Sequence, residues 1–234
     1  MGTSKDIKGP SGRPWTNYRR SATTFVRDRG DEPARRMFER FVEALGGAAG
    51  GAEASRQWVA SAQRTAGLAS AAGAAPLRAV FEDLGLADLV GLGREDMLSG
   101  LADELAGDGS TLDEQAIRDA LLFTFDEAFP EALTADQILD QTLSAGQVEE
   151  ILGTFFARFV FTLLLRDLEP RIAKVGSTTE QQAIVDEAWD RTRALVRLRL
   201  DDVDVLAFPW TTQAGADRLR EMVQEAFGLM EDLE

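Results

Sequence analysis

Residues 144–168 form the most apolar stretch of the chain, and their pattern predicts one long helix. Ser144 and Gln147 fit a capping box, and Leu143 and Val148 are placed to close a hydrophobic staple. Such a helix would be about 36 Å long, enough to cross a small domain. Burial of its large side chains, at about 1.5–3 kcal/mol each, would dominate folding. These side chains are Ile151, Leu152, Phe155, Phe156, Phe159, Val160, Phe161, Leu163, Leu164, Leu165 and Leu168.

A polar stripe distinguishes this stretch from a membrane span. Every fourth residue is polar, and the apolar block is too short to cross a bilayer. We expect a buried helix that touches solvent along one winding edge, and no membrane segment. The stripe consists of Glu150, Thr154, Arg158, Thr162 and Arg166.

Helical periodicity and capping residues recur along the chain. Thr16 is placed to cap a short helix that ends at Gly30, and Asp31 to cap a second helix that Gly46 and Gly47 end. We therefore predict an all-α fold, with a flexible tail over residues 1–16 and a single multi-helix domain over residues 17–234, packed around the long central helix. Further helices are expected to begin at Pro76, Arg94, Thr111, Thr134 and Ser177, and after Pro209.

Two stretches allow alternatives. Residues 46–75 are rich in alanine and glycine, which predicts a small-residue helix from about Glu53 to Ala72 or, alternatively, a flexible linker. Val196, Leu198 and Leu200 alternate with arginines, so a small hairpin competes with a helix end over residues 196–206.

The chain contains no cysteine and no histidine. This composition excludes thiol nucleophiles, Ser-His and Cys-His pairs, and zinc sites built from these residues. The carboxylates of Asp201, Asp202 and Asp204 fit an exposed acidic turn better than a cation site. No group of residues assembles a nucleophile, a base and an orienting group. The sequence therefore offers no candidate catalytic residue, metal site or cofactor site.

Charge divides the chain unevenly. Residues 1–30 carry seven basic and two acidic side chains, a net charge of +5, so the remainder carries −20 of the total of −15. Aromatic and basic residues mix at Arg13, Trp15, Tyr18, Arg19 and Arg20, as they do in contacts with single-stranded nucleic acid. The acidic body disfavours nucleic acid, and anchoring of Trp15 and Tyr18 on the domain is the preferred interpretation. No secretory signal is evident, so we expect a cytoplasmic protein.

The first residues also carry a recognisable motif. Gly2 permits removal of Met1, which leaves an unhindered α-amine. The sequence Met1-Gly2-Thr3-Ser4, then Lys8-Gly9-Pro10-Ser11-Gly12 and Pro14-Trp15-Thr16 before a basic amphipathic helix, resembles the QatB components of bacterial Qat anti-phage systems. Qat systems combine this component with a P-loop ATPase, a QueC-like enzyme and a TatD-like nuclease.

The resemblance implies a non-enzymatic subunit and suggests a role for its tail. QueC-like enzymes perform amide and nitrile chemistry on 7-deazaguanine, so the amine of Gly2 is a candidate acceptor of a 7-deazaguanine carboxyl group. The implied partners are the QueC-like enzyme and the ATPase, with the nuclease as a further candidate. The alternatives are a structural adaptor that is never modified and a nucleic-acid-binding subunit. The residues expected to contact partners are Thr3, Ser4, Gly9, Pro10, Gly12, Pro14 and Trp15.

Overall fold

Helices account for the regular structure of the chain. The computed structural model describes residues 12–107, 112–200 and 202–232, and no strand occurs within these ranges. The all-α prediction is therefore confirmed. The helices are α1 (Arg13–Asp28), α2 (Asp31–Leu45), α3 (Gly47–Ala54), α4 (Arg56–Ala71), α5 (Leu77–Asp83), the short 3-10 helix η1 (Ala87–Leu89), α6 (Arg94–Ala106), α7 (Leu112–Ala128), α8 (Ala135–Leu139), α9 (Ala145–Ile172), α10 (Thr178–Leu195) and α11 (Gln213–Glu231).

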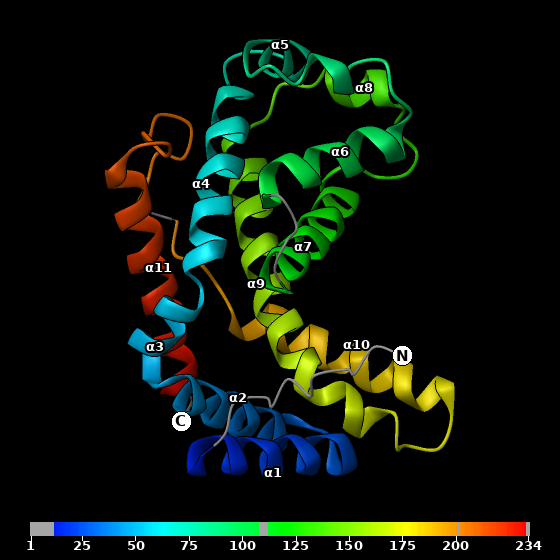
Figure 1. The fold of residues 1–234 in the computed structure, drawn as a ribbon, viewed down its shortest axis with the longest axis vertical. Coiled ribbons are helices and arrows are strands. Elements are labelled where there is room, and N and C mark those ends of the chain that lie inside the picture. The colour runs from blue at the N-terminus through cyan, green and yellow to red at the C-terminus, as the bar shows by residue number, and fades with distance from the viewer. Residues whose placement is uncertain (1–11, 108–111, 201, 233–234) are drawn as a thin grey trace, which may run out of the picture.

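The helix α9 is the centre of the fold, as its apolar sequence predicted. It contacts α1, α4, α7 and α10. In Figure 1, α4, α9 and α11 follow the long axis of the molecule, while α1 and α2 lie together at one end and α5 and α8 at the other. Ser144 and Gln147 form both hydrogen bonds of the predicted capping box. One continuous core thus joins all these helices.

The C-terminal end of α9 lies beyond its predicted position at Leu168. The helix passes through Pro170 and ends at Ile172, although proline removes a backbone donor and usually ends a helix. Ile172 is buried, and the side chain of Arg171 binds α1. Tertiary contacts therefore stabilise a last turn that local sequence rules would not predict.

The polar stripe of α9 meets solvent at both ends, where Glu150 and Arg166 are exposed, so the expected exposed edge is confirmed there and is interrupted only in the middle. Thr154 is only 7% exposed. The guanidinium carbon of Arg158 lies 4.0, 4.9 and 5.2 Å from the ring centroids of Phe123, Phe161 and Trp189. Cation–π contacts and α10 thus cover the middle of the stripe, which lets α9 be buried on almost every side.

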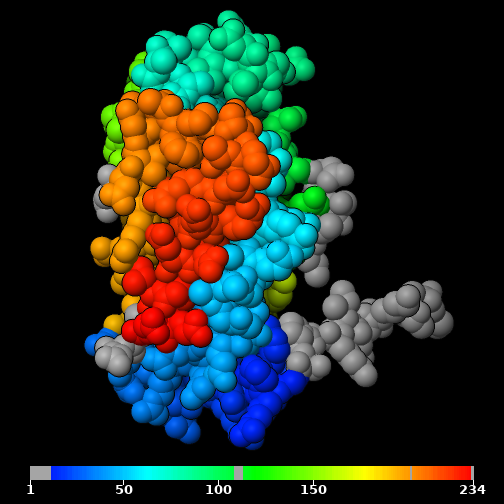
Figure 2. All heavy atoms as spheres, turned by 90° about the vertical axis from the view of Figure 1, so that its left-hand side faces the viewer, coloured from blue at the N-terminus to red at the C-terminus, as the bar shows by residue number. Residues whose placement is uncertain are grey.

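The alanine-rich region forms two helices rather than one. The backbone breaks at Ser55, between α3 and α4. The small residues of α3 allow α11 to approach closely, since a Cβ atom added at Gly51 would lie 2.5 Å from the ring of Phe227. Figure 2 shows α11 lying along α3 and α4 on one face of the molecule. The linker alternative is excluded, because these segments carry part of the core.

The segment after α10 adopts neither an extended helix nor a hairpin. α10 ends at Leu195, and the described residues from 196 to 212 form turns and irregular backbone. The buried Trp210 holds this segment together, because its Nε1 donates a 2.8 Å hydrogen bond to the carbonyl oxygen of Val205. The segment therefore covers the core without regular hydrogen bonding.

Candidate functional site

The residues with the sharpest functional predictions lie at the N-terminus. Gly2, Thr3, Ser4, Gly9 and Pro10 fall outside the described residues. Gly12, Pro14 and Trp15 lie within them, at the start of α1. The site can therefore be built from the point where the tail meets the body.

The helix α1 begins earlier than predicted. Its first residue is Arg13, and Pro14 occupies the first turn, a position that tolerates the missing backbone donor. Thr16 lies inside the helix instead of capping it, and its hydroxyl donates a 3.0 Å hydrogen bond to the carbonyl oxygen of Gly12. Gly12 adopts a φ of 124°, a region that strongly favours glycine. The predicted boundary at residue 16 therefore included the first turn of α1 in the tail.

Aromatic side chains fix α1 to the body. The rings of Trp15 and Tyr18 lie 5.8 Å apart in an edge-to-face arrangement, and Phe41 of α2 lies 6.5 Å from Trp15 and 5.4 Å from Tyr18. The Tyr18 hydroxyl donates a 3.4 Å hydrogen bond to the carbonyl oxygen of Leu164 in α9. Tyr18 is fully buried and Trp15 is half-buried. The preferred interpretation of these two residues as anchors is thus supported, and Tyr18 cannot stack on a nucleic-acid base.

The environment of Tyr18 keeps its hydroxyl neutral. Burial raises the pKa of Tyr18 far above its ordinary value, and the negative charge of Asp167 raises it further. A buried phenolate would lack the solvation that stabilises its charge. Tyr18 therefore acts as an apolar anchor with one hydrogen-bond donor and has no acid–base function.

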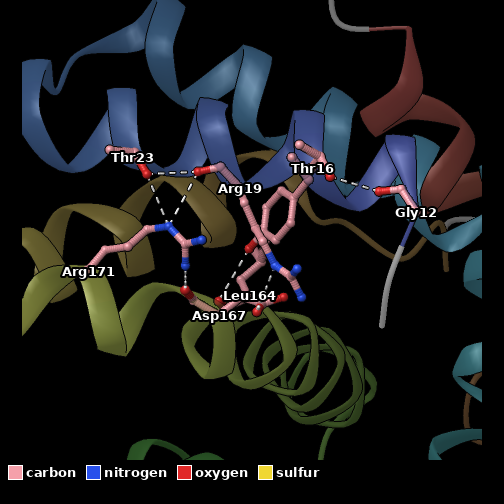
Figure 3. A network of polar contacts seen from close by, with 8 residues as sticks. Gly12, Thr16, Arg19, Thr23, Leu164, Asp167 and Arg171 are labelled. Carbon is pink, nitrogen blue, oxygen red and sulfur yellow. Dashed lines mark hydrogen bonds and ion pairs between the residues drawn. The ribbon is translucent and has the colours of Figure 1, made fainter. Parts of the chain in front are cut away.

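A polar network also joins α1 to the C-terminal part of α9 (Figure 3). The Nε of Arg171 donates to the backbone carbonyl of Arg19 at 3.3 Å and to Oγ1 of Thr23 at 3.1 Å. The Arg19 side chain lies 4.0 Å from a carboxylate oxygen of Asp167. Another nitrogen of Arg171 donates to the backbone carbonyl of Asp167. Arg171 thus links the backbones of α1 and α9.

Two neighbouring hollows border this network. One, of about 940 Å³, lies between α1, the end of α9 and the start of α10, and the other, of about 520 Å³, follows α1. They share Thr23 and Arg171, and we call them together the α1 groove. Six basic and two acidic side chains line it, a net charge of +4 in a protein whose net charge is −15. The charged lining residues are Arg19, Arg20, Arg27, Arg29, Arg171, Lys174, Asp28 and Glu180.

Both acidic residues of the groove have local partners. Asp28 forms a 2.6 Å ion pair with Arg27, which lowers the pKa of its carboxyl group. A carboxylate oxygen of Glu180 accepts from the backbone N–H of Ser177 at 3.2 Å, in the predicted capping box of α10. These contacts leave the groove with an excess of positive charge, and its lining residue Thr16 is hydrogen-bonded to Gly12.

Sequence reasoning identified the basic residues of α1 but missed the groove. The spacing of Thr16, Arg19, Thr23 and Arg27 on one face of α1 was the only local signal. Arg171 comes from a helix about 150 residues further along the chain, and no local pattern connects it to α1.

Other kinds of site receive no support from the geometry. Within residues 12–107, 112–200 and 202–232, no cluster of Asp and Glu residues is arranged to hold a metal ion. In the same part of the chain, no helix has the length and apolar character needed to cross a bilayer.

Comparison with protein families matches residues 46–230 to the family described as Qat anti-phage system associated protein QatB. This match confirms the family that the N-terminal motif indicated. It lies in the helical body and does not include residues 1–45, which carried the resemblance. A comparison with curated proteins and one with solved structures each found no significant match.

Proposed function

This chain belongs to the QatB family of Qat anti-phage system proteins, and from that premise we propose that it presents its N-terminal tail to a QueC-like partner in the cytoplasm, without catalysis of its own. The α-amine of Gly2 is the proposed acceptor of a 7-deazaguanine carboxyl group. The helical body positions the tail and contacts the other subunits, among which we include the P-loop ATPase.

The anchoring of α1 is the observation that carries this proposal. Trp15 and Tyr18 fix the first turns of α1 to α2 and α9, so the tail leaves the body from a defined point. From Gly12 back to Gly2, the chain can reach at most about 35 Å when fully extended. That length is sufficient to bring the α-amine into an active site of a partner that touches the body.

The proposed reaction forms an amide bond. The partner would first join the carboxyl group to a phosphoryl or nucleotidyl group from a nucleoside triphosphate. The α-amino nitrogen of Gly2 would then attack the carboxyl carbon, lose a proton to a base of the partner and displace the phosphate or nucleoside monophosphate. The partner must activate the carboxyl group and accept the proton, because the first twelve residues contain no histidine and only one carboxylate, Asp6. A small second residue favours this step, since a bulky side chain beside the amine would hinder attack.

Substitution of Gly2 tests the proposal in cells that carry the whole defence system. We expect Gly2→Leu to abolish protection against phage, because the side chain obstructs the amine. Gly2→Ala is the matched control, which keeps a small residue next to Met1 and should retain protection. Full protection by Gly2→Leu would refute the modification.

A structural adaptor is the second candidate, and the packing of Trp15 is equally compatible with it. In that case the tail is a binding arm held at one end by the aromatic cluster. Deletion of residues 2–12 distinguishes the two, because co-purification of the subunits would be lost for an adaptor arm and retained for a modified tail. The third candidate, a nucleic-acid-binding subunit, predicts an affinity for nucleic acid that falls steeply with salt.

A further inference from the structure

The α1 groove differs in charge from the rest of the protein. Its charged lining residues sum to +4, whereas the rest of the chain carries −19. We propose that this groove docks an acidic surface beside the active site of the enzyme that receives the N-terminal tail. The inference rests on the proposed function, because it takes the tail to be delivered to a partner enzyme.

Two basic side chains in the groove are available to a partner. Arg20 and Lys174 are exposed, and neither has an ion-pair partner among the described residues. The guanidinium of Arg171 contacts two backbone carbonyls and one hydroxyl, none of which neutralises its charge. The groove therefore offers fixed positive charge at its centre and adaptable positive charge at its edges.

The groove also begins beside the point where the described chain starts. Thr16, one of its lining residues, is hydrogen-bonded to Gly12, where the described chain begins. An enzyme that takes up Gly2 has its active-site entrance within about 35 Å of this end of α1. The groove runs along α1 within that radius, so an acidic surface beside the entrance can meet it.

The surrounding negative charge makes this docking selective. An acidic partner surface is attracted only where the body is locally positive, and approach in other orientations brings like charges together. A long nucleic acid, by contrast, would extend over the acidic body after it left the groove. Screening reduces interactions beyond about 8 Å at physiological salt, so local groove charges dominate for a compact acidic surface.

Charge reversal in the groove tests the inference with the full-length protein and the purified QueC-like subunit. We expect Arg20→Glu with Lys174→Glu to weaken their affinity about ten-fold at about 50 mM NaCl, mainly through slower association. Arg20→Gln with Lys174→Gln should give an intermediate loss. The matched control is Arg197→Glu with Arg199→Glu, which makes the same change in net charge at exposed residues outside the groove and should alter the affinity by less than about two-fold. Circular dichroism verifies that each variant is folded.

Each other outcome would overturn the inference. Equal affinities for the groove and control variants would show that only net charge matters, and an affinity insensitive to salt would exclude an electrostatic dock. Failure of the wild-type proteins to bind each other, or groove-dependent binding to a single-stranded oligonucleotide with unchanged affinity for the enzyme, would also contradict it.

The mass of the N-terminal peptide that carries Gly2 distinguishes failure of the docking inference from failure of the proposed function. If Gly2 is modified and the groove variant keeps its affinity for the QueC-like subunit, the docking inference is refuted and the proposed modification is retained. If binding depends on the groove but Gly2 is unmodified, the proposed modification is refuted and the docking inference is retained.

Discussion

The close approach of α3 and α11 predicts opposite effects for the same substitution at two glycines. A Cβ atom added at Gly51 would lie 2.5–2.8 Å from three ring atoms of Phe227, well below an ordinary contact of 3.4–4 Å. At Gly153 in α9, an added Cβ atom would meet nothing within 4 Å. Both residues lie in helices, so both gain helix propensity when replaced by alanine.

The magnitude follows from separating two contributions. Alanine gains about 1 kcal/mol over glycine in a helix interior, and this gain applies to both variants. At Gly51, Phe227 or one of the helices must move by about 1 Å, and overpacking of this kind costs about 1–3 kcal/mol. We therefore expect Gly153→Ala to stabilise the protein and Gly51→Ala to be less stable than Gly153→Ala by about 1–3 kcal/mol, because the propensity gain cancels in the comparison.

Chemical denaturation of the two variants gives the required free energies of unfolding. In thermal unfolding, each kcal/mol should shift the midpoint by about 2–4 °C for a chain of this size. A double-mutant cycle with Phe227→Leu identifies the cause, since a smaller side chain removes the collision and should reduce the cost of Gly51→Ala. The proposed contact would be refuted if the two alanine variants were equally stable. It would also be refuted if Gly51→Ala lowered the free energy of unfolding by the same amount in the Phe227→Leu background.

Two further predictions concern the buried Tyr18 and the half-buried Arg158. Tyr18, the only tyrosine in the chain, should show no phenolate absorbance in the folded protein as the pH rises above its ordinary pKa of about 10. Because the pKa of Tyr18 is raised in the folded protein, its contribution to the free energy of unfolding is complete below about pH 10. Above about pH 10 the free energy of unfolding should fall by up to about 1.4 kcal/mol per pH unit, and Tyr18→Phe should reduce this decrease. Arg158→Ala should lower the free energy of unfolding by about 1–3 kcal/mol through lost cation–π contacts and packing, as measured by denaturation, whereas Arg158→Lys should lower it less. Early titration of Tyr18, or equal effects of the two Arg158 substitutions, would contradict these assignments.

Local signals explain why the helices could be predicted. Each capping box is formed within four residues, so Thr134, Ser144 and Ser177 identified three helix starts that the structure confirms. The long apolar run is also a local signal, and it identified α9 as the core helix because so many large apolar side chains are stable only when they are buried.

Contacts between distant residues explain what could not be predicted. The last turn of α9, beyond Pro170, depends on Arg171 binding α1. Arg158 is covered because Phe123 and Trp189 come from two other helices. The α1 groove likewise requires α1, α9 and α10 to meet, so only its α1 face had a local sequence pattern.

The N-terminal glycine provides the most direct test of the central claim. The measurement is the intact mass of this protein, with mapping of its N-terminal peptide, after co-expression with the other subunits of its defence system. We predict that Met1 is absent and that Gly2 carries added mass that disappears when the QueC-like subunit is omitted. An unmodified Gly2 in the complete system under phage challenge would contradict the claim and favour the adaptor.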